Sequence, residues 1–222
     1  LVTLRGRAMQ EAATATPSTM LAVMGLDEAK ANELCQAAAQ GQVLVCANFN
    51  APGQIVLSGD VDACQRAQAL AGDFGASGAV SLKVAGAFHS PFMAPAAEKL
   101  AQALGAVSFR PAVDAEPAAR DAQATPAFAQ EFASAGVKVI ANVWAEAYAC
   151  PCSVSSGLLA QLTGSVRWAQ SVKGLLDGGV EKFYEIGPGK VLTGLMRRIN
   201  RRADITTVNS REALEKLAAD IG

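Results

Sequence analysis

The chain contains a single histidine, His89, within the run Gly-Ala-Phe-His-Ser at 86–90. Neutral imidazole titrates at roughly pH 6.5, which makes it the side chain best suited to accept a proton at neutral pH. His89 follows a β-like run at 80–84 and precedes Pro91, which can open a helix over 92–104. Such strand-to-helix corners often expose reactive side chains, so His89 is a candidate general base. The alternative is a hydrogen-bonded core histidine.

Arg5 is the second candidate, because it falls on an apolar stripe with Leu1, Met9 and Ala12 if residues 1–13 are helical. A guanidinium in such a place needs an anion, since an unpaired buried charge is costly, and its fork matches a carboxylate. The alternative is an arginine that extends to solvent from the edge of the stripe. Other apolar residues blur the stripe, so the pattern alone favours this alternative.

Residues 185–190, Glu-Ile-Gly-Pro-Gly-Lys, are typical of a strand, a tight turn and a helix start. They do not form a phosphate-binding loop, which would need glycine in place of Tyr184 and serine or threonine in place of Val191. We therefore expect a strand-to-helix turn whose backbone lines the site.

A basic cluster lies near the expected end of a helix at 190–202 and comprises Arg197, Arg198, Arg201 and Arg202. The helix dipole favours cations there, so a solvated face is the simplest interpretation. The alternative is a docking patch for an acidic partner.

Composition excludes several classes of protein. The formal net charge of −1 argues against nucleic-acid binding, which depends on neutralising phosphates. No apolar run approaches the roughly 20 residues that cross a membrane. Five cysteines with one histidine give no zinc-like spacing, predict no metal site and suggest a reducing compartment. The segment Cys-Pro-Cys at 150–152 is too tight for an ordinary structural disulfide and predicts a loop.

The apolar periodicity of residues 19–84 predicts the element order βαββαβ, which is that of a ferredoxin-like module. Asp27 and Asp60 are expected to cap its two helices. The inward face of the first helix should carry Ala31, Leu34, Cys35 and Ala38. The expected strands are 19–24, 43–49, 54–58 and 80–84.

The chain after His89 alternates between helix and strand and predicts the remainder of an α/β domain. Strands of the buried, parallel kind are expected at 137–143, 183–186 and 205–208, with helices at 153–163, 166–177, 190–202 and 210–220. The Ala- and Pro-containing stretch 110–136 predicts a surface insertion. The expected division is a helix of the large domain at 1–16, the ferredoxin-like subdomain at 17–86 and the large α/β domain at 87–222.

Several of these segments together, in this order, resemble the malonyl-CoA:acyl-carrier-protein transacylase family. The matching segments are 1–10, 45–59 (VCANFNAPGQIVLSG), 86–93 (GAFHSPFM), 142–145, 161–162 with 166–168, and 184–192 (YEIGPGKVL). The resemblance implies an α/β-hydrolase-like acyltransferase domain with an inserted ferredoxin-like subdomain.

The resemblance also implies roles for five residues. Arg5 would hold the malonyl carboxylate, and His89 would be the general base for a serine nucleophile. The backbone carbonyl of Gln161 would orient the imidazole in place of a triad carboxylate. Phe88 would mark a pocket that prefers malonyl over an α-methylated extender, and Asn48 would lie near the site.

The implied reaction is malonyl transfer from coenzyme A to the phosphopantetheine thiol of acyl carrier protein in fatty-acid biosynthesis, by a ping-pong mechanism. Malonyl-CoA is the substrate and the partner carries the phosphopantetheine, so no cofactor of the chain's own is expected. Acyl carrier proteins are acidic, and the basic cluster would meet one. The expected compartment is the cytoplasm of a bacterium, or a plastid or mitochondrion of a eukaryote.

The chain contains no Gly-x-Ser-x-Gly elbow. The family's nucleophile, in a Gly-His-Ser-x-Gly elbow, is expected just upstream of Leu1. The chain is therefore expected to be the C-terminal portion of such an enzyme, inactive alone. Two alternatives stay open: a non-catalytic truncated paralogue that binds acyl carrier protein or acyl-CoA, and a piece of a polyketide synthase acyltransferase domain.

Overall fold

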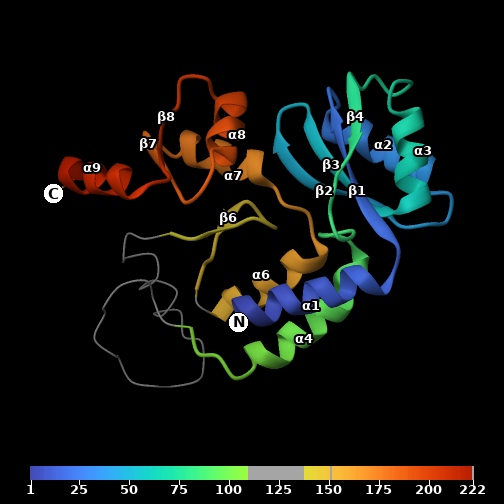
Figure 1. Ribbon diagram of the computed structural model, residues 1–222, viewed down its shortest axis with the longest axis horizontal. Helices are drawn as coiled ribbons and strands as arrows, with labels where there is room; N and C mark the ends of the chain where they lie inside the picture. The colour runs from blue at the N-terminus through green and yellow to red at the C-terminus, as the bar shows by residue number, and fades with distance from the viewer. Residues whose placement is uncertain (110–137, 151, 222) are drawn as a thin grey trace.

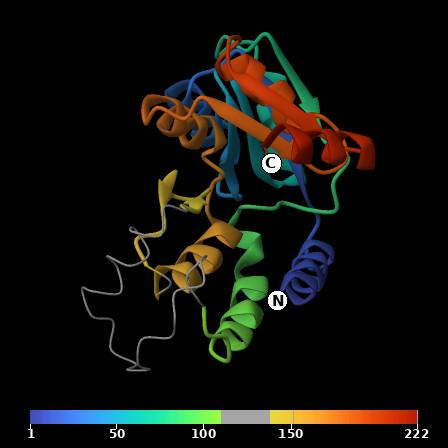
Figure 2. The ribbon, with the colours of Figure 1, turned by 90° about the vertical axis from the view of Figure 1, so that its left-hand side faces the viewer.

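The computed structural model describes residues 1–109, 138–150 and 152–221, so the expected insertion at 110–136 lies outside the described residues (Figure 1). The described chain builds a four-stranded sheet with two helices, a layer of three helices, and a C-terminal unit of helices and parallel strands. In both ribbon views the helical layer lies below the sheet and the C-terminal unit (Figure 1 and Figure 2).

The sheet unit has the predicted order βαββαβ. Its elements are β1 (Ser18–Met24), α2 (Glu28–Ala39), β2 (Leu44–Ala51), β3 (Gln54–Asp60), α3 (Val61–Leu70) and β4 (Gly78–Ser81). The strands lie in the order β2-β3-β1-β4, and every neighbouring pair is antiparallel. Strands that alternate between two faces place Leu21, Val23, Ile55 and Leu57 in the core against α2 and α3. The opposite face carries Met20, Ala47 and Val56, which pack against Phe88.

Helix α2 forms as predicted. The Asp27 carboxylate accepts a hydrogen bond from Lys30 N at 2.8 Å, which satisfies one free N–H of the first turn. All four residues expected on its inward face are buried, and the helix ends at Gln40 with the left-handed φ of 48°.

Asp60 and β4 differ from prediction. Asp60 does precede α3, but its carboxylate makes no cap and instead accepts from Val43 N at 2.7 Å, joining the start of β2 to the end of β3. Strand β4 covers Gly78–Ser81, two residues earlier than predicted. Its side chains are largely exposed because it is an edge strand that pairs only with β1.

The helical layer comprises α1 (Val2–Ala15), α4 (Ala94–Leu104) and α6 (Cys152–Thr163), with a 3-10 turn η1 (Pro91–Met93) before α4. Their shared core contains Ala8, Ala12, Ala13, Met93, Ala96, Leu100, Leu104 and Leu162. The small alanines of α1 allow a close approach: a Cβ at Gly86 would lie 2.7 Å from the Cβ of Ala13. Glycine at 86 therefore lets α1 lie directly against the segment that carries His89.

The C-terminal unit comprises α7 (Trp168–Asp177), β7 (Lys182–Ile186), α8 (Val191–Ile199), β8 (Asp204–Val208) and α9 (Arg211–Ile221). Strands β7 and β8 are parallel, as predicted. They are not the buried strands that were expected, since Ile186 is 72% and Tyr184 41% exposed. Parallel sheets are normally covered on both faces. Here β7 and β8 pair only with each other among the described residues.

The strand predicted at 137–143 is wrong within the described residues. Only β5 (Ile140–Ala141) is extended, and it pairs antiparallel with β6 (Glu146–Ala147). The chain reverses between them, where Ala145 N donates to Ala141 O at 2.8 Å and Ala145 has a φ of 58°. A short apolar run therefore forms a hairpin rather than a buried parallel strand.

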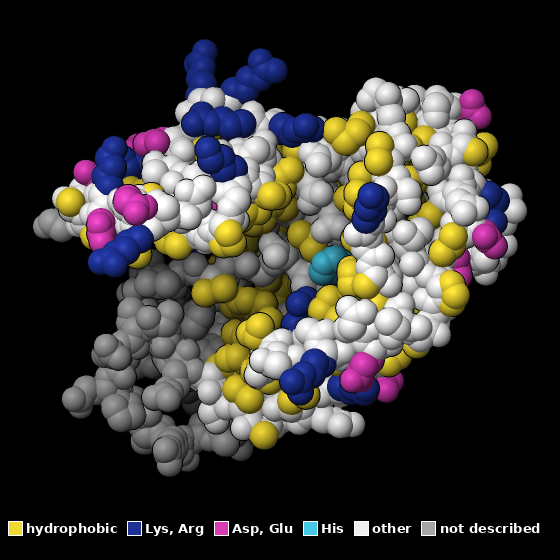
Figure 3. Space-filling model, in the orientation of Figure 1, with side chains coloured by type: hydrophobic (Ala, Val, Ile, Leu, Met, Phe, Trp, Pro, Cys, Tyr) yellow, Lys and Arg dark blue, Asp and Glu magenta, His cyan; other side chains and the backbone are white. Residues whose placement is uncertain are grey.

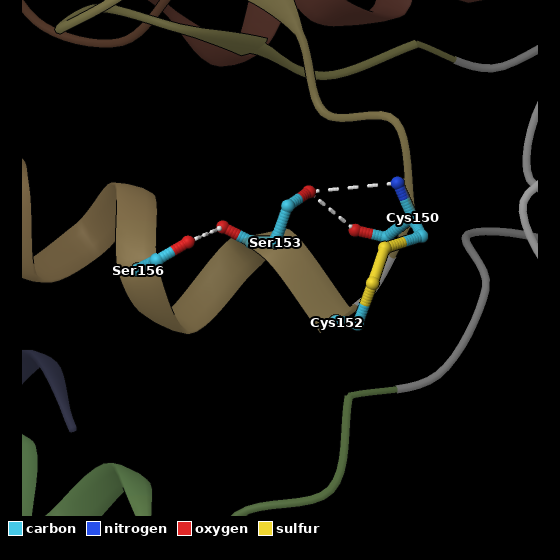
Figure 4. Close-up of a disulfide and its surroundings, with 4 residues drawn as sticks. All are labelled: Cys150, Cys152, Ser153 and Ser156. Carbon is cyan, nitrogen blue, oxygen red and sulfur yellow. Dashed lines mark hydrogen bonds between the residues drawn. A yellow bond between two sulfur atoms is a disulfide. The ribbon is translucent and has the colours of Figure 1, made fainter. Parts of the chain in front are cut away.

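Cys150 and Cys152 form a disulfide just before and at the start of α6, which contradicts the loop expected there (Figure 4). Their Cα atoms are 5.2 Å apart, within the usual range for a disulfide. Ser153 Oγ also donates to Cys150 O at 2.7 Å, which ties this segment to the first turn of α6. In the described part of the chain, no helix has the length and apolar character needed to cross a bilayer.

Candidate active site

A cavity of about 390 Å³ lies between the helical layer and the face of the sheet that carries Met20 and Val56, opposite α2 and α3. Figure 3 shows this hollow, with the only histidine in it. The lining residues come from α1, from three strands or their ends, and from the segment after β4. They are Arg5, Met9, Met20, Asn48, Asn50, Val56, Leu82, Phe88 and His89. Four of the five residues singled out from the sequence thus line one cavity.

His89 has an unusual backbone conformation, with a φ of 58°. For a residue other than glycine this region costs about 1–3 kcal/mol and persists only when neighbouring contacts enforce it. Two buried serines enforce it here. Ser58 Oγ donates to Phe88 O at 2.7 Å, and Ser90 Oγ donates to Ala87 O at 2.6 Å. The histidine is therefore held between two anchored residues.

Gln161, the fifth residue, contacts His89 from α6. His89 Nδ1 donates to the Gln161 backbone carbonyl at 2.9 Å. A carbonyl oxygen only accepts, so Nδ1 carries the hydrogen and Nε2 keeps its lone pair. The Gln161 amide donates to Gly164 O at 3.0 Å, which closes the turn after α6. This geometry fixes the tautomer in which Nε2 is the basic atom.

Burial lowers the pKa of His89 from its usual value, and the nearby Arg5 guanidinium lowers it further. The carbonyls of Gln161 and Gly164 oppose this effect. Burial dominates because the charged imidazolium loses hydration. The imidazole is therefore neutral at pH 7, the state in which it can accept a proton.

Arg5 is half-buried on α1 and lines the cavity. It lies at the edge of the apolar face formed by Ala8 and Ala12 rather than in its centre, since Leu1 is 45% exposed. Arg5 takes part in none of the four ion pairs that the described residues make. The cavity wall thus presents a guanidinium and no carboxylate, which suits an anionic ligand.

Asn48 lies on β2, where the pairing with β3 shifts register between Cys46 and Asn48. It forms an isolated parallel bridge with Val166. Val166 N donates to Ala47 O, and Phe49 N donates to Val166 O, both at 2.8 Å. Through these bonds β2 contacts the chain just after Gln161. Asn48 therefore lies near the segment whose carbonyl binds His89.

The turn at 185–190 does not line the cavity, contrary to expectation. The buried Glu185 carboxylate instead accepts from Leu192 N at 2.9 Å and Thr193 N at 2.8 Å, and the bonds to Thr193 and Leu192 lower its pKa. The N-terminus of α8 thus already has an anion from its own chain. This explains why the turn resembles an anion-binding loop without being one.

The four arginines of the basic cluster are all exposed. Arg197 and Arg198 lie in the last turn of α8, whereas Arg201 and Arg202 follow the helix, which ends earlier than predicted. Lys and Arg side chains gather over the C-terminal unit on the same face as the hollow that holds the histidine (Figure 3). Arg197 Nη1 donates to Arg201 O at 2.9 Å.

Sequence patterns missed three residues of the site. Ser58 occupies an inward position in an apolar strand, and a buried hydroxyl must find a partner, which was the available signal. Ser90 precedes Pro91 and accepts from Phe92 N at 3.3 Å, as a capping residue does. Asn50 lies near the end of β2 and lines the cavity.

No protein-family model matches the chain. The chain is 36% identical over 214 residues to the malonyl CoA-acyl carrier protein transacylase of Escherichia coli strain K12, covering 96% of this chain and 62% of that protein. An acyl carrier protein S-malonyltransferase from Vibrio cholerae aligns with a TM-score of 0.80 at 36% identity, covering 96% of this chain and 62% of that one. The malonyl-transacylase in a complex with its type II PKS acyl-carrier protein aligns with a TM-score of 0.82 at 32% identity, covering 98% and 63%.

The chain therefore spans about three fifths of the length of the relatives it matches. The similarity extends over nearly the whole chain, in sequence and in fold. On this basis the chain is similar, over nearly its whole length, to malonyl CoA-acyl carrier protein transacylases.

Proposed function

We propose that this chain is the substrate-recognition and general-base part of an [acyl-carrier-protein] S-malonyltransferase of fatty-acid biosynthesis. The observation that carries the proposal is the meeting of Arg5, Asn48, Phe88 and His89 at one cavity. His89 is held there through Nδ1 by the Gln161 carbonyl at 2.9 Å. The relatives, which are longer proteins, are named for the same activity.

In the proposed mechanism the nucleophile is a serine outside this sequence. His89 Nε2 takes the proton of that serine while its oxygen attacks the malonyl thioester, and backbone N–H groups stabilise the oxyanion. The imidazolium returns the proton to the departing coenzyme A thiol. In the second half-reaction His89 deprotonates the phosphopantetheine thiol, which attacks the malonyl ester and frees the serine. The Gln161 carbonyl keeps Nδ1 protonated throughout, the role a carboxylate has in a Ser-His-Asp triad.

Acyl selectivity comes from Arg5 and Phe88. Arg5 pairs with the free malonyl carboxylate, and hydrogen bonds to charged groups are worth about 1.5–3 kcal/mol each. Phe88 lines the same cavity as His89, and in this proposal its ring restricts the space for an α-methyl group. Asn48 adds an amide donor and acceptor to the same wall.

The proposal includes the architecture and the partner. Residues 17–86 are a ferredoxin-like subdomain, inserted into an α/β-hydrolase-like domain to which 1–16 and 87–222 contribute. Acyl carrier protein docks on the basic cluster, whose exposed charges lie on the same face as the cavity (Figure 3). Opposite charges speed such a transient encounter.

The experiment is to sequence the native transcript upstream of the Leu1 codon and then to assay the complete product. We expect a Gly-His-Ser-x-Gly elbow, and malonyl transfer from coenzyme A to holo acyl carrier protein, followed by intact-protein mass spectrometry. His89→Ala should lower kcat by about 10²–10⁴-fold, the usual contribution of a general base. The surface change Lys173→Ala, on α7, is the matched control and should leave kcat unchanged.

The same experiment also tests a second function, because the serine elbow is not within this sequence. A start codon close to Leu1, or an elbow without its serine, would leave His89 nothing to deprotonate. The chain would then be a paralogue that binds acyl-CoA or acyl carrier protein without turnover. Binding of malonyl-CoA by a protein that transfers nothing would establish this second function.

A further inference from the structure

We propose that Cys35 and Cys46 form an oxidation site that closes to a disulfide when the protein meets a peroxide. Cys35 lies on α2 and Cys46 on β2, and their sulfur atoms are 3.8 Å apart. A disulfide bond is about 2.05 Å long, so the two sulfurs need to approach by about 1.8 Å. This inference concerns the core of the sheet unit and does not depend on the proposed function.

The two thiols are placed by elements that pack firmly together. Cys35 occupies the inward face of α2, and Cys46 lies on the edge strand β2, where it pairs with Leu57 of β3. Both are nearly buried, at 5% and 6% exposed. The third free cysteine, Cys64, is also buried, but its sulfur donates to Thr19 O at 3.7 Å. The closeness of the Cys35 and Cys46 sulfur atoms therefore results from how α2 packs on β2, since Cys64 is also buried but contacts a different group.

A small oxidant can reach the pair from a groove of about 580 Å³ that Cys35 and Cys46 both line. The rest of its wall is mixed: Glu28, Asn32, Gln36, Ser165 and Arg167 are polar or charged, whereas Ala39, Leu44, Val45 and Phe49 are apolar. Arg167 lies there, with its guanidinium 3.3 Å from the Glu28 carboxylate and 5.2 Å from the centre of the Phe49 ring. The groove thus offers charged and polar groups beside the two sulfurs, with which hydrogen peroxide can form hydrogen bonds.

The hydrogen bond between the thiols makes them unequal. It raises the pKa of Cys35, which burial raises further, and it lowers the pKa of Cys46, which burial opposes. Cys46 is therefore the thiol that ionises first and attacks the oxidant, because the thiolate is the nucleophilic form.

The chemistry balances with hydrogen peroxide as the oxidant. The Cys46 sulfur attacks one peroxide oxygen, the O–O bond breaks, and a sulfenic acid and one water form. The Cys35 sulfur then attacks the sulfenic sulfur and displaces its oxygen as a second water, forming the S–S bond. Two thiols are oxidised by two electrons in total, and one peroxide is reduced to two waters.

Closure would fasten α2 to β2 two residues before Asn48. Ser165 Oγ donates to the Cys46 carbonyl at 2.6 Å, so this part of β2 also contacts the chain that follows Gln161. The oxidation site is thus next to the candidate active site but on the opposite side of the strand.

The test treats the folded chain with hydrogen peroxide, blocks free thiols with iodoacetamide and digests with chymotrypsin. Chymotrypsin cuts after Leu44 and Phe49, which separates Cys35, Cys46 and Cys64 onto different peptides. We expect a linked peptide that contains Cys35 and Cys46 and is released by dithiothreitol. Free Cys46 should disappear about tenfold faster than free Cys64, because a thiol with a resolving partner and a lowered pKa reacts first.

Two variants make the result specific. Cys46→Ser should abolish the linked peptide and leave Cys35 reduced, whereas Cys64→Ser is the matched control and should leave the link unchanged. The proposal is overturned if Cys35 and Cys46 stay reduced while Cys64 oxidises, or if all three react at one rate. It is also overturned if the link forms only in denaturant. The wild-type measurement stands on its own should either variant fold poorly.

Discussion

Replacing Ser58 by alanine tests whether a buried hydroxyl on the sheet holds the histidine in place. Ser58 is fully buried, and its Oγ donates to Phe88 O at 2.7 Å, the only hydrogen bond that the carbonyl accepts from the described residues. Leaving such an acceptor without a donor costs about 1–3 kcal/mol. At about 1.4 kcal/mol per factor of ten, the folded-to-unfolded ratio should fall about 5- to 150-fold.

Urea unfolding followed by tryptophan fluorescence measures the loss, and proton NMR measures its effect on the site. Because the chain has one histidine, its imidazole gives one set of resonances, which should shift or broaden in Ser58→Ala.

Ser171→Ala is the matched control for this substitution. Ser171 is also buried, and its hydroxyl donates to Arg167 O at 3.1 Å. That carbonyl keeps a second bond, from Ser171 N at 3.0 Å, so little stability should be lost. The reasoning is refuted if Ser58→Ala costs less than about 0.5 kcal/mol, the usual scatter for surface changes, or leaves the imidazole resonances unmoved.

Three further predictions concern the cavity. In the complete enzyme, Arg5→Ala should lower kcat/KM for malonyl transfer by about 10- to 150-fold, which corresponds to the loss of one hydrogen bond to a charged group. The kcat/KM for acetyl transfer should fall far less, because acetyl has no free carboxylate. Equal losses for both acyl groups would contradict the pairing of Arg5 with the malonyl carboxylate. Phe88→Ser should raise the methylmalonyl-to-malonyl ratio of transfer rates, and an unchanged ratio would remove Phe88 from selectivity. Burial and Arg5 depress the pKa of His89. As the pH falls, His89 is therefore protonated in the unfolded chain before it is protonated in the folded chain. Its contribution to the free energy of unfolding is complete above roughly pH 6.5 and is lost below it. The Tm should drop between about pH 7 and about pH 5, and drop less in His89→Gln; equal drops would exclude His89 as the cause.

Local patterns were enough to predict most of the sheet unit. Asp27 caps α2 because its carboxylate needs only a partner three residues away, at Lys30. The alternation of apolar residues set the inward faces of β1 and β3, since the two faces of a strand are fixed by its pleat. The helices of the C-terminal unit could be placed within a few residues because their apolar residues recur with the helical period.

Contacts between distant segments could not be predicted from such patterns. Asp60 looks like a cap in sequence, but β2 brings Val43 N to it across 17 residues. The bond from Ser58 to Phe88 joins residues 30 apart. The exposure of β7 could not be predicted either, because an apolar run in the sequence does not show how many strands pair with it or which elements cover it.

The candidate site itself was predicted by the family resemblance more than by spacing. Arg5, Asn48 and His89 come from three separate elements, and only the fold brings them to one cavity. Periodicity alone favoured a solvent-directed Arg5, and the structure places it half-buried at the cavity wall. The roles of these residues in transfer stay predictions.

The short ladder at Val166 has a mechanical consequence for the cavity. The sheet unit and the helical layer are connected covalently twice, at residues 16–17 and at 82–90. Two connections alone would leave an axis about which one body could swing. The bonds from Val166 N to Ala47 O and from Phe49 N to Val166 O add a third attachment that resists this rotation. These three attachments fix the width of the cavity. In the proposed function, acyl selection therefore depends on fit to a cavity of fixed width and not on closure of the protein around the acyl group.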